Sequence, residues 1–427
     1  MQRRTVLKAM LAAGVAPMIL PARVLGQQAP SKRITLGCIG VGSQGHSNLQ
    51  AFLNQDDAQV LAVCDVFADR REAARRKVNA TYKAEGCASV EDFREIIARK
   101  DIDAVVLSTP DHWHVPMALL ALEAGKDVFS EKPTHTIAEG RELRDAVKKR
   151  KAVFQMGIED RSLAHFHKMI ELVRNDAIGS PGHIAVSLPC GIANPKEAPA
   201  PVPAGLNYDL FLGPAPFQPY TPHRTDAMHW RFIRDYGTGS LVDWGSHLVD
   251  TAQLAANDPA VCPVEAKGTG VTPTGAEADV PVSFDLHYRY GNGVTLDVKS
   301  GDSPSGDGRS ASIRIEGSRG WIEKTPWSGP LRASDEAILR MKVAPETSKF
   351  WPLPKSEQRN FLDCVKSRAP TTYTEDTMHL LHVTLHMGLI AIALGRTLRW
   401  DTAAELFVDD AEANALQARP RRMDWAK

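Results

Sequence analysis

An aspartate and a histidine four residues apart, Asp243 and His247, lie in the segment GSLVDWGSHLVD (residues 239–250). The apolar residues of this segment predict a helix against a buried surface, and the spacing puts both polar side chains on one face of that helix. An imidazole can accept a proton near neutral pH, and a carboxylate beside it can hold its tautomer and stabilise the cation. The pair predicts a general base, with a buried structural pair as the alternative.

Three glycines, Gly40, Gly42 and Gly45, form the pattern G-x-G-x-x-G between a predicted strand and a predicted helix. Such a turn lets a pyrophosphate approach backbone N–H groups at the N-terminus of the helix, where the helix dipole favours negative charge. Asp65 ends the next predicted strand, where a carboxylate can bind the ribose hydroxyls of NAD. These residues predict NAD as the cofactor, while the arginines of the following ADRRE segment leave NADP open.

Two further strand ends carry polar side chains, in the segments STPDHWH (residues 108–114) and EKP (residues 131–133). Because a doubly wound sheet binds its ligand at the carboxyl ends of its strands, we expect both segments near the cofactor. We expect a lowered pKa for Lys132 in a partly buried crevice, with a surface salt bridge as the alternative. His112 and His114 could equally be loop or capping residues. The residues expected to contact the cofactor are Gly40, Gly42, Gly45, Asp65, Ser108, Thr109, Pro110, His114, Glu131 and Lys132.

The elements that position these residues predict an α/β protein of two domains. Over residues 32–157, apolar runs such as ITLGCIG, QVLAVCD and DAVVLST alternate with amphipathic helical segments, which predicts a doubly wound parallel sheet of the Rossmann type. Over residues 158–400, alternating strands such as PVSFDLHYRY and GVTLDVKS predict an α+β domain with an open, largely antiparallel sheet. A proline-rich but aromatic stretch, residues 189–222, predicts an ordered loop beside a site. Residues 401–427 are expected to form a polar tail.

Composition and the N-terminal segment limit the partners. The chain has 51 basic and 51 acidic side chains, and this balance argues against a nucleic-acid or membrane-surface partner. Residues 1–26 contain paired arginines before a weakly apolar run, which predicts a twin-arginine-type signal peptide and a periplasmic or otherwise exported protein. We expect no membrane span after its removal. No metal site is expected, because no acid or cysteine completes a set with His379, His382 and His386.

Taken together, the glycine turn with Asp65, STPDHWH, EKP and DWGSH (residues 243–247) resemble the Gfo/Idh/MocA family of sugar oxidoreductases. The resemblance spans nearly the whole chain after residue 26. It implies a Rossmann domain and an open-sheet domain whose helix reaches back over the nicotinamide, and it implies Lys132, Asp243 and His247 as the catalytic trio. Residues 158–161 read IEDR where relatives often have a glutamine. Weaker candidates for substrate contacts are Trp113, Arg161, Trp230 and Arg231.

The chemistry implied for this trio is the oxidation of an alcohol. Removing a hydride from a carbinol carbon is favourable only as the hydroxyl proton leaves, so a base must lie within hydrogen-bond reach. His247 would take that proton, Asp243 would hold its tautomer, and Lys132 would stabilise the negative charge that develops on the oxygen. We therefore expect an NAD(P)-dependent oxidoreductase acting on a CH–OH group of a sugar, sugar derivative or polyol. Family habit suggests a homodimer or homotetramer.

Export and a nicotinamide cofactor conflict, because such cofactors are not normally pooled outside the cytoplasm. An enzyme folded before transport could carry a trapped cofactor, which would then have to be restored in each catalytic cycle. The alternative function is an NAD-dependent glycoside hydrolase or lyase that works through a transient keto-sugar. Relatives of that kind commonly lack the EKP lysine, which is present here. A non-catalytic NAD- or sugar-binding protein is the third hypothesis.

Overall fold

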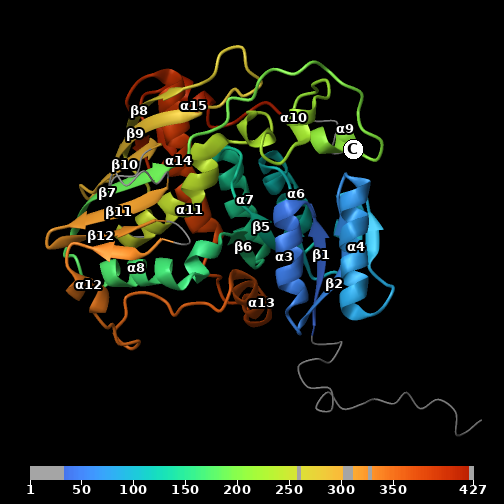
Figure 1. Ribbon diagram of the computed structural model, residues 1–427, viewed down its shortest axis with the longest axis horizontal. Coiled ribbons are helices and arrows are strands. Elements are labelled where there is room, and N and C mark those ends of the chain that lie inside the picture. Colours follow the sequence, from blue (N-terminus) through green and yellow to red (C-terminus); the bar gives the residue numbers. More distant parts are fainter. Residues whose placement is uncertain (1–32, 257–260, 302–310, 326–328, 423–427) are drawn as a thin grey trace, which may run out of the picture.

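Two sheets, with helices packed between them, divide the chain into an N-terminal and a C-terminal part (Figure 1). The computed structural model describes residues 33–256, 261–301, 311–325 and 329–422. The predicted signal peptide, residues 1–26, lies outside the described residues. The two-sheet architecture confirms the predicted α/β fold class.

The first sheet has six parallel strands in the order β3-β2-β1-β4-β5-β6. Its central strands are buried along almost their whole length because helices cover both faces. The sequence predicted these strands except the three-residue edge strand β3. The strands are β1 Ile34–Ile39, β2 Ala58–Cys64, β3 Ala88–Val90, β4 Ala104–Leu107, β5 Asp127–Glu131 and β6 Phe154–Gly157. The helices are α3 Ser43–Leu53, α4 Ala68–Tyr82, α5 Phe93–Ala98, α6 Asp111–Glu123 and α7 Ile137–Arg150.

The second sheet has nine strands in the order β13-β12-β11-β7-β10-β9-β8-β14-β15. All neighbouring pairs are antiparallel except β7 and β10, which run parallel. Burial alternates along β9 and β10, so one face of the sheet packs on helices and the other is open, as predicted. The strands are β7 Pro181–Leu188, β8 Glu265–Val271, β9 Ser283–Arg289, β10 Thr295–Ser300, β11 Ser312–Gly317, β12 Gly320–Lys324, β13 Leu331–Ala333, β14 Leu398–Asp401 and β15 Leu406–Phe407.

Helix α11, Gly239–Ala256, is the predicted helix that carries Asp243 and His247, and it packs against β7, β11 and two further helices, α8 and α14. Most of its residues are buried on all sides, as expected for a helix between layers. In its first three turns the positions that are not fully buried are Asp243, Trp244 and His247. The helix therefore presents its polar pair to one partly open space.

Helix α14, Glu375–Leu394, is the central core helix of the C-terminal part and contacts α7, α11 and β8. Among the described residues it has the length and composition that a membrane span would need, which the sequence analysis did not anticipate. Of its most apolar window, 67% is buried inside the protein. The protein core therefore accounts for its apolar character.

One segment late in the sequence packs against the N-terminal part. Helix α13, Glu357–Ser367, packs Phe361 against Phe52 and Phe129 of the first sheet's core. The segment expected to be a polar tail is also folded onto the protein, with Arg422 donating hydrogen bonds to the Gly213 carbonyl and to Asp209. The proline-rich stretch is largely loop, as predicted, and also contains the short helix α9, Tyr208–Leu212. The remaining elements are η3 Glu159–Ser162, α8 Ala164–Arg174, α10 Pro222–Thr225, η4 Trp230–Phe232, α12 Glu336–Arg340 and α15 Ala411–Ala415.

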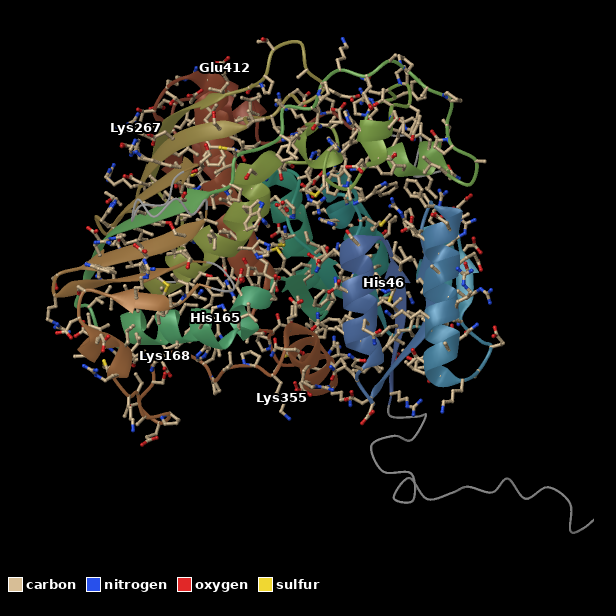
Figure 2. All side chains as sticks on the ribbon, in the orientation of Figure 1. His46, His165, Lys168, Lys267, Lys355 and Glu412 are labelled. Carbon is tan, nitrogen blue, oxygen red and sulfur yellow. The ribbon has the colours of Figure 1, made fainter. Side chains whose placement is uncertain are left out.

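Charged side chains such as Lys267, Lys355 and Glu412 project outward from the surface (Figure 2). Acidic and basic residues alternate there, as in the exposed pairs of Arg396 with Asp410 and Glu412. The described surface accordingly fits the balanced charge of the chain.

Candidate active site

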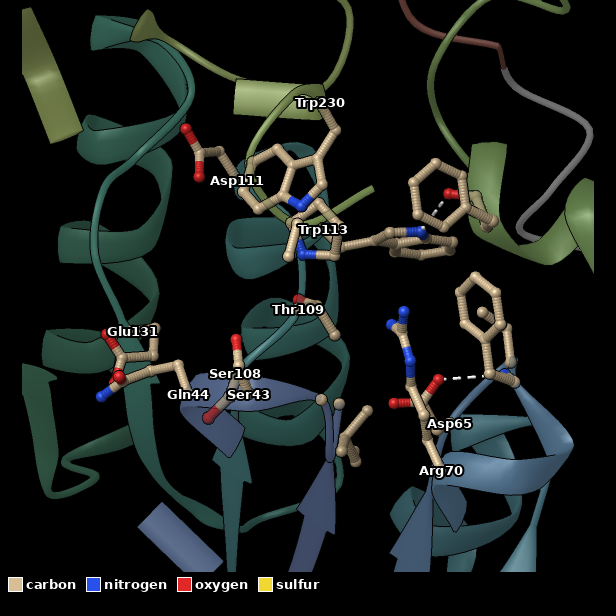
Figure 3. A pocket seen from close by; sticks show the side chains of 18 of the residues that line it. Ser43, Gln44, Asp65, Arg70, Ser108, Thr109, Asp111, Trp113, Glu131 and Trp230 are labelled. Atoms are coloured by element: carbon tan, nitrogen blue, oxygen red, sulfur yellow. Dashed lines mark hydrogen bonds between the residues drawn. The ribbon is translucent and has the colours of Figure 1, made fainter. Parts of the chain in front are cut away.

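A cavity opens at the carboxyl ends of β1, β2, β4 and β5, between the first sheet, the start of α11 and the loop around residues 210–231. It encloses about 1220 Å³ of space, its open mouth included. Figure 3 shows Asp65 and Arg70 on one side of it, Gln44 and Glu131 on the other, and Trp113 and Trp230 above the strand ends. This is the position at which a doubly wound sheet binds a dinucleotide.

Each of the three glycines in the turn after β1 has a different structural role. Gly40 adopts φ +77°, and a Cβ there would lie 2.5 Å from the carbonyl oxygen of Ser108. A Cβ on Gly45 would lie 1.9 Å from the Gly40 carbonyl oxygen, so glycine lets α3 approach the turn. Gly42 caps α3 and lines the cavity, and a Cβ there would meet only the tip of Arg70 at 3.5 Å.

The turn therefore leaves open space beside backbone N–H groups at the start of α3, which suits a pyrophosphate. Gly40 and Gly42 line the cavity as expected. Gly45 does not: its role is in packing the helix against the turn, which corrects its assignment as a cofactor contact.

Asp65 lies at the end of β2, lines the cavity and is held by the backbone around it. Its carboxylate accepts hydrogen bonds from the N–H groups of Val41 (2.9 Å) and Phe67 (3.0 Å). Burial raises the pKa of Asp65 above its usual value, although both hydrogen bonds favour the ionised form. The guanidinium of Arg70 lies 3.8 Å above the Phe67 ring and also lines the cavity. A ribose diol fits this carboxylate, and Arg70 is the group near it that could meet a 2′-phosphate.

The end of β4 contributes Ser108, Thr109 and Pro110 to the cavity wall, as predicted. Glu131 at the end of β5 also lines the wall. Its Oε1 accepts hydrogen bonds from Asn48 (2.7 Å) and Gln44 (3.1 Å) of α3, two partners that the sequence analysis missed. Burial raises the pKa of Glu131 in spite of these bonds. The residues present on this side of the cavity thus fit a dinucleotide.

Lys132 and Asp243, which lie 111 residues apart in the sequence, meet as a partly buried ion pair that lines the cavity. The Lys132 ammonium donates hydrogen bonds to Asp243 Oδ1 and to the Asp243 carbonyl oxygen, and Arg231 Nε lies 3.6 Å from Asp243 Oδ2. Burial favours neutral side chains, but the attraction between the two charges outweighs it. The pKa of Lys132 is therefore raised and that of Asp243 is lowered to about 2. The expectation of a lowered pKa for Lys132 was wrong: the side chain is a fixed cation.

His247 also lines the cavity, but its partner is not Asp243. Its Nδ1 lies 2.8 Å from Oδ2 of Asp160, a carboxylate that is completely buried in η3. Burial alone would lower the pKa of His247, whereas the charge and the hydrogen bond of Asp160, assisted by Glu159, raise it above its usual value. The tautomer of His247 is therefore held by Asp160, which corrects the role given to Asp243. When neutral, the ring carries its basic lone pair on Nε2.

Asp160 could have been found from its position, because it follows the carboxyl end of β6 just as Lys132 follows β5. In the sequence, residues 158–161 stood out only as a departure from relatives. Asp111, the first residue of α6, was likewise passed over although it lines the cavity. Burial and the nearby Asp243 raise the pKa of Asp111 to about 7, and its Oδ2 accepts a hydrogen bond from Thr238 at 3.0 Å.

Besides Gly45, two predicted site residues lie outside the cavity and have structural roles. Both ring nitrogens of His114 lie within hydrogen-bond distance of backbone carbonyls, those of Pro133 (3.0 Å) and Thr109 (2.8 Å), and burial lowers its pKa to about 4. Arg161 forms a buried ion pair with Asp250 and lies 3.6 Å from the centre of the Tyr373 ring. Neither contacts the cavity, which corrects their assignment to cofactor and substrate.

The other predicted substrate contacts do lie at the cavity. Trp113, Trp230 and Arg231 line it, and Trp113 Nε1 donates a hydrogen bond to the Phe211 carbonyl oxygen at 3.0 Å. Arg231 lies 4.5 Å from the centre of the Trp230 ring, close to Asp243. The histidines of α14 are packed in the core, with His386 Nε2 at 2.9 Å from the Thr134 carbonyl oxygen.

Two family models match this chain. The Gfo/Idh/MocA model described as an oxidoreductase-family NAD-binding Rossmann fold matches residues 34–158, and the model of the family's C-terminal alpha/beta domain matches residues 165–427. The predicted cofactor class is thereby confirmed: the N-terminal part is an NAD-binding domain.

Curated relatives match over a shorter stretch. A glycosyl hydrolase family 109 protein of Saccharopolyspora erythraea is 39% identical over 109 residues, 25% of this chain and 24% of that protein. An alpha-N-acetylgalactosaminidase of Shewanella oneidensis is 35% identical over 127 residues, 29% of this chain and 28% of that protein. The chain thus spans about a quarter of the length of these relatives.

Solved structures match over most of the chain. An aldose-aldose oxidoreductase from Caulobacter crescentus, complexed with glycerol, has a TM-score of 0.62 and 20% identity, covering 86% of this chain and 99% of that one. A levoglucosan dehydrogenase in complex with NADH and levoglucosan has a TM-score of 0.61 and 17% identity, covering 88% and 100%. At these identities the likeness is one of fold.

Proposed function

This chain belongs to the Gfo/Idh/MocA oxidoreductase family, and we propose that it oxidises a CH–OH group of a sugar, sugar derivative or polyol with NAD as the electron acceptor. One observation carries the proposal: Lys132 from the first domain and Asp243 and His247 from the second line the same cavity as the glycine turn. A base, a fixed cation and a dinucleotide site at one cavity are the set that alcohol oxidation needs.

The roles of the residues follow from their partners. When bound, the oxidised nicotinamide supplies the acceptor for the hydrogen and two electrons that leave the carbinol carbon. His247 accepts the hydroxyl proton at Nε2, and Asp160 stabilises the imidazolium that forms. The Lys132 ammonium donates a hydrogen bond to the same oxygen as negative charge develops on it. Asp243 keeps Lys132 charged and in position.

The walls of the cavity support a carbohydrate as the substrate. Trp113 and Trp230 offer apolar faces on which the C–H groups of a sugar ring can pack, and Arg231 and Asp111 offer a donor and an acceptor for its hydroxyls. Asp65 supports NAD rather than NADP, because a 2′-phosphate would face its carboxylate.

The test is a screen of aldoses, polyols and glycosides with purified protein, with and without added NAD, following NADH absorbance and sugar products. Lys132→Met and His247→Ala are expected to bind NAD as the wild type does but to lose turnover. A screen with no oxidised product, or full turnover in His247→Ala, would overturn the proposal.

A second function, an NAD-dependent glycoside hydrolase or lyase, is favoured by the matches to glycosyl hydrolase family 109 proteins and by Asp111. Oxidation of one carbinol to a ketone acidifies the neighbouring C–H, whose proton passes to a base while the glycosidic oxygen leaves with a proton from an acid. Water then adds across the resulting double bond, and the hydride first removed is returned to the ketone. A carboxylic acid with a pKa of about 7 can supply the proton to the leaving oxygen. Products separate the two functions: an accumulating ketose or lactone marks the oxidoreductase, and a released aglycone without net oxidation marks the hydrolase.

We further propose export with a tightly bound cofactor, because the chain begins with a twin-arginine-type segment. Denaturing the purified protein and identifying the released cofactor by mass spectrometry tests this. Protein that arrives empty and is active only with added NAD would contradict it. The proposed homo-oligomer is tested separately, by light scattering on the eluting protein.

A further inference from the structure

A histidine and two glutamates converge where three loop segments meet beside the proposed substrate wall. Glu197 lies in the proline-rich loop, His223 in α10, and Glu277 in the segment that leads to β9. One potential ligand atom from each lies within 4.8 Å of the others. None of the three is among the described residues that line the cofactor cavity.

Two of the spacings between these atoms are close to those around a small divalent ion. His223 Nδ1 lies 3.4 Å from Glu197 Oε2 and 3.8 Å from Glu277 Oε2. Ligand atoms held about 2.0–2.2 Å from a tetrahedral zinc ion are about 3.3–3.6 Å apart. Small movements of the side chains would therefore bring all three atoms to one ion.

Two of the three atoms that would face the ion lack hydrogen-bond partners among the described residues. His223 Nδ1 and Glu277 Oε2 are buried and form no hydrogen bond with any described residue, and the Glu277 side chain is only 4% exposed. A buried carboxylate oxygen without a partner is unfavourable, and a cation beside it relieves this. The charge is also suitable, because Arg224, 3.0 Å from Glu277 Oε1, balances only one of the two carboxylates.

The surrounding contacts hold the three side chains in place, as outer partners do around metal ligands. Thr221 Oγ1 donates to Glu277 Oε1 at 2.8 Å, which leaves Oε2 directed at His223. Glu197 Oε2 accepts the backbone N–H of His223 at 2.8 Å. The ring of His229 stacks on that of His223 with centroids 4.1 Å apart.

We propose that His223, Glu197 and Glu277 bind one divalent metal ion of the zinc class, with water completing its coordination. The imidazole nitrogen favours zinc over magnesium or calcium, which prefer oxygen ligands alone. Thr225 and Ala227, which line the cavity, lie two and four residues after His223. The ion therefore links the part of the cavity wall around Thr225 and Ala227 to the loops of Glu197 and Glu277. This inference does not depend on which reaction the protein catalyses.

The test uses the untagged full chain after dialysis against a chelator. Calorimetric titration with zinc chloride at pH 7.5 is expected to give one site per chain, and magnesium chloride to give none. Zinc is also expected to raise Tm and to slow proteolysis between residues 196 and 231. His223→Ala and Glu277→Gln are expected to weaken zinc binding at least tenfold, and circular dichroism confirms that each variant is folded.

His287→Ala is the matched control, because His287 also lies between two carboxylates, Asp285 (3.3 Å) and Asp297 (2.7 Å), but on the open sheet. It is expected to keep the zinc site. If the wild type binds no zinc, the cluster is a set of contacts among these side chains alone, and the proposal is overturned. Zinc binding that persists in both site variants, or disappears in the control, overturns it equally.

Discussion

The replacement Asp160→Asn tests whether Asp160 raises the basicity of His247 and fixes its tautomer. Asp160 is completely buried, and its Oδ2 lies 2.8 Å from His247 Nδ1. Asparagine has nearly the same size but no charge, and its amide can present an N–H group to the imidazole in place of an acceptor oxygen. The change should leave the fold intact and remove both the stabilised imidazolium and the fixed tautomer.

The magnitude follows from the hydrogen bond that is lost. Hydrogen bonds to charged groups contribute about 1.5–3 kcal/mol, and each 1.36 kcal/mol of transition-state stabilisation is a factor of ten in rate. Because proton transfer builds positive charge on the ring, most of this contribution belongs to the transition state. We expect kcat/KM to fall about 10- to 150-fold, with the affinity for NAD unchanged.

The pH dependence provides a second, independent measure. His247 must be neutral to accept a proton, so kcat/KM for oxidation rises with pH through the pKa of His247. Asp160 raises that pKa, whereas burial and Lys132 lower it. Without the charge of Asp160 the pKa falls, and the acidic limb of the profile is expected to move to lower pH while the plateau drops.

The free energy of unfolding of the wild type and of Asp160→Asn should also depend differently on pH. The native pKa of His247 lies above its value in the unfolded chain, so protonation of His247 stabilises the wild type at low pH. This contribution is fully present below the unfolded value and is lost as pH rises through the native value. Asp160→Asn is expected to lack it, so urea denaturation should separate the two proteins more at pH 5.5 than at pH 9.

The assay is steady-state NADH formation from pH 5 to 10, with Asp250→Asn as the control. Asp250 is also a buried carboxylate and lies on α11, but it pairs with Arg161 and Tyr373 rather than with His247. The control should lower the free energy of unfolding without moving the acidic limb. An acidic limb that stays in place in Asp160→Asn, or moves to higher pH, would refute the proposed coupling.

Three further predictions concern the cofactor turn and the other charged groups. Gly42→Ala places a methyl group in the cavity beside the start of α3, so NADH titration by fluorescence should show roughly tenfold or greater loss of affinity with Tm unchanged. Lys132→Met leaves the Asp243 carboxylate without its main partner, so we expect the pKa of Asp243 to rise from about 2. The free energy of unfolding at pH 7, measured in urea, is expected to fall by about 3 kcal/mol. Asp111 has a native pKa of about 7, so between about pH 4 and 7 the native state holds a proton that the unfolded chain has lost, and stability falls as pH rises. Asp111→Asn should remove this fall, so the variant should be up to about 4 kcal/mol more stable to unfolding than the wild type at pH 8 and about equally stable at pH 4. If the free energies of unfolding of the two proteins change in parallel with pH, the prediction is contradicted.

Much of the fold was predictable because its signals are local. The run of apolar residues in β1, the three glycines after it and Asp65 at the end of β2 follow from backbone geometry over about thirty residues. The alternation along β9 and β10 likewise predicts a sheet with one open face. The three-residue strand β3 was missed, because so short an edge strand carries almost no periodic signal.

Helix α13 is a different case. It lies far along the chain from the first sheet, yet Phe361 completes that sheet's core beside Phe52 and Phe129. The helix was not among the elements predicted from the sequence, and no local signal there shows which surface it covers. A boundary drawn from sequence therefore assigned it to the second domain, because an apolar helical face does not specify which core it joins.

The candidate site also combines features set by the local sequence with features set by tertiary packing. The residue types at the strand ends, and the helical face shared by Asp243 and His247, are properties of the sequence, because they depend on chain direction and on the 3.6-residue period. Which carboxylate pairs with His247 and which with Lys132 was settled by the tertiary packing of α11, within the second domain for Asp160 and across the two domains for Lys132. His247 and Asp160 are 87 residues apart and Lys132 and Asp243 are 111 apart. Hydrogen bonds over such separations require ångström-scale placement of α11 against the ends of β5 and β6, and no local pattern in the chain encodes that distance.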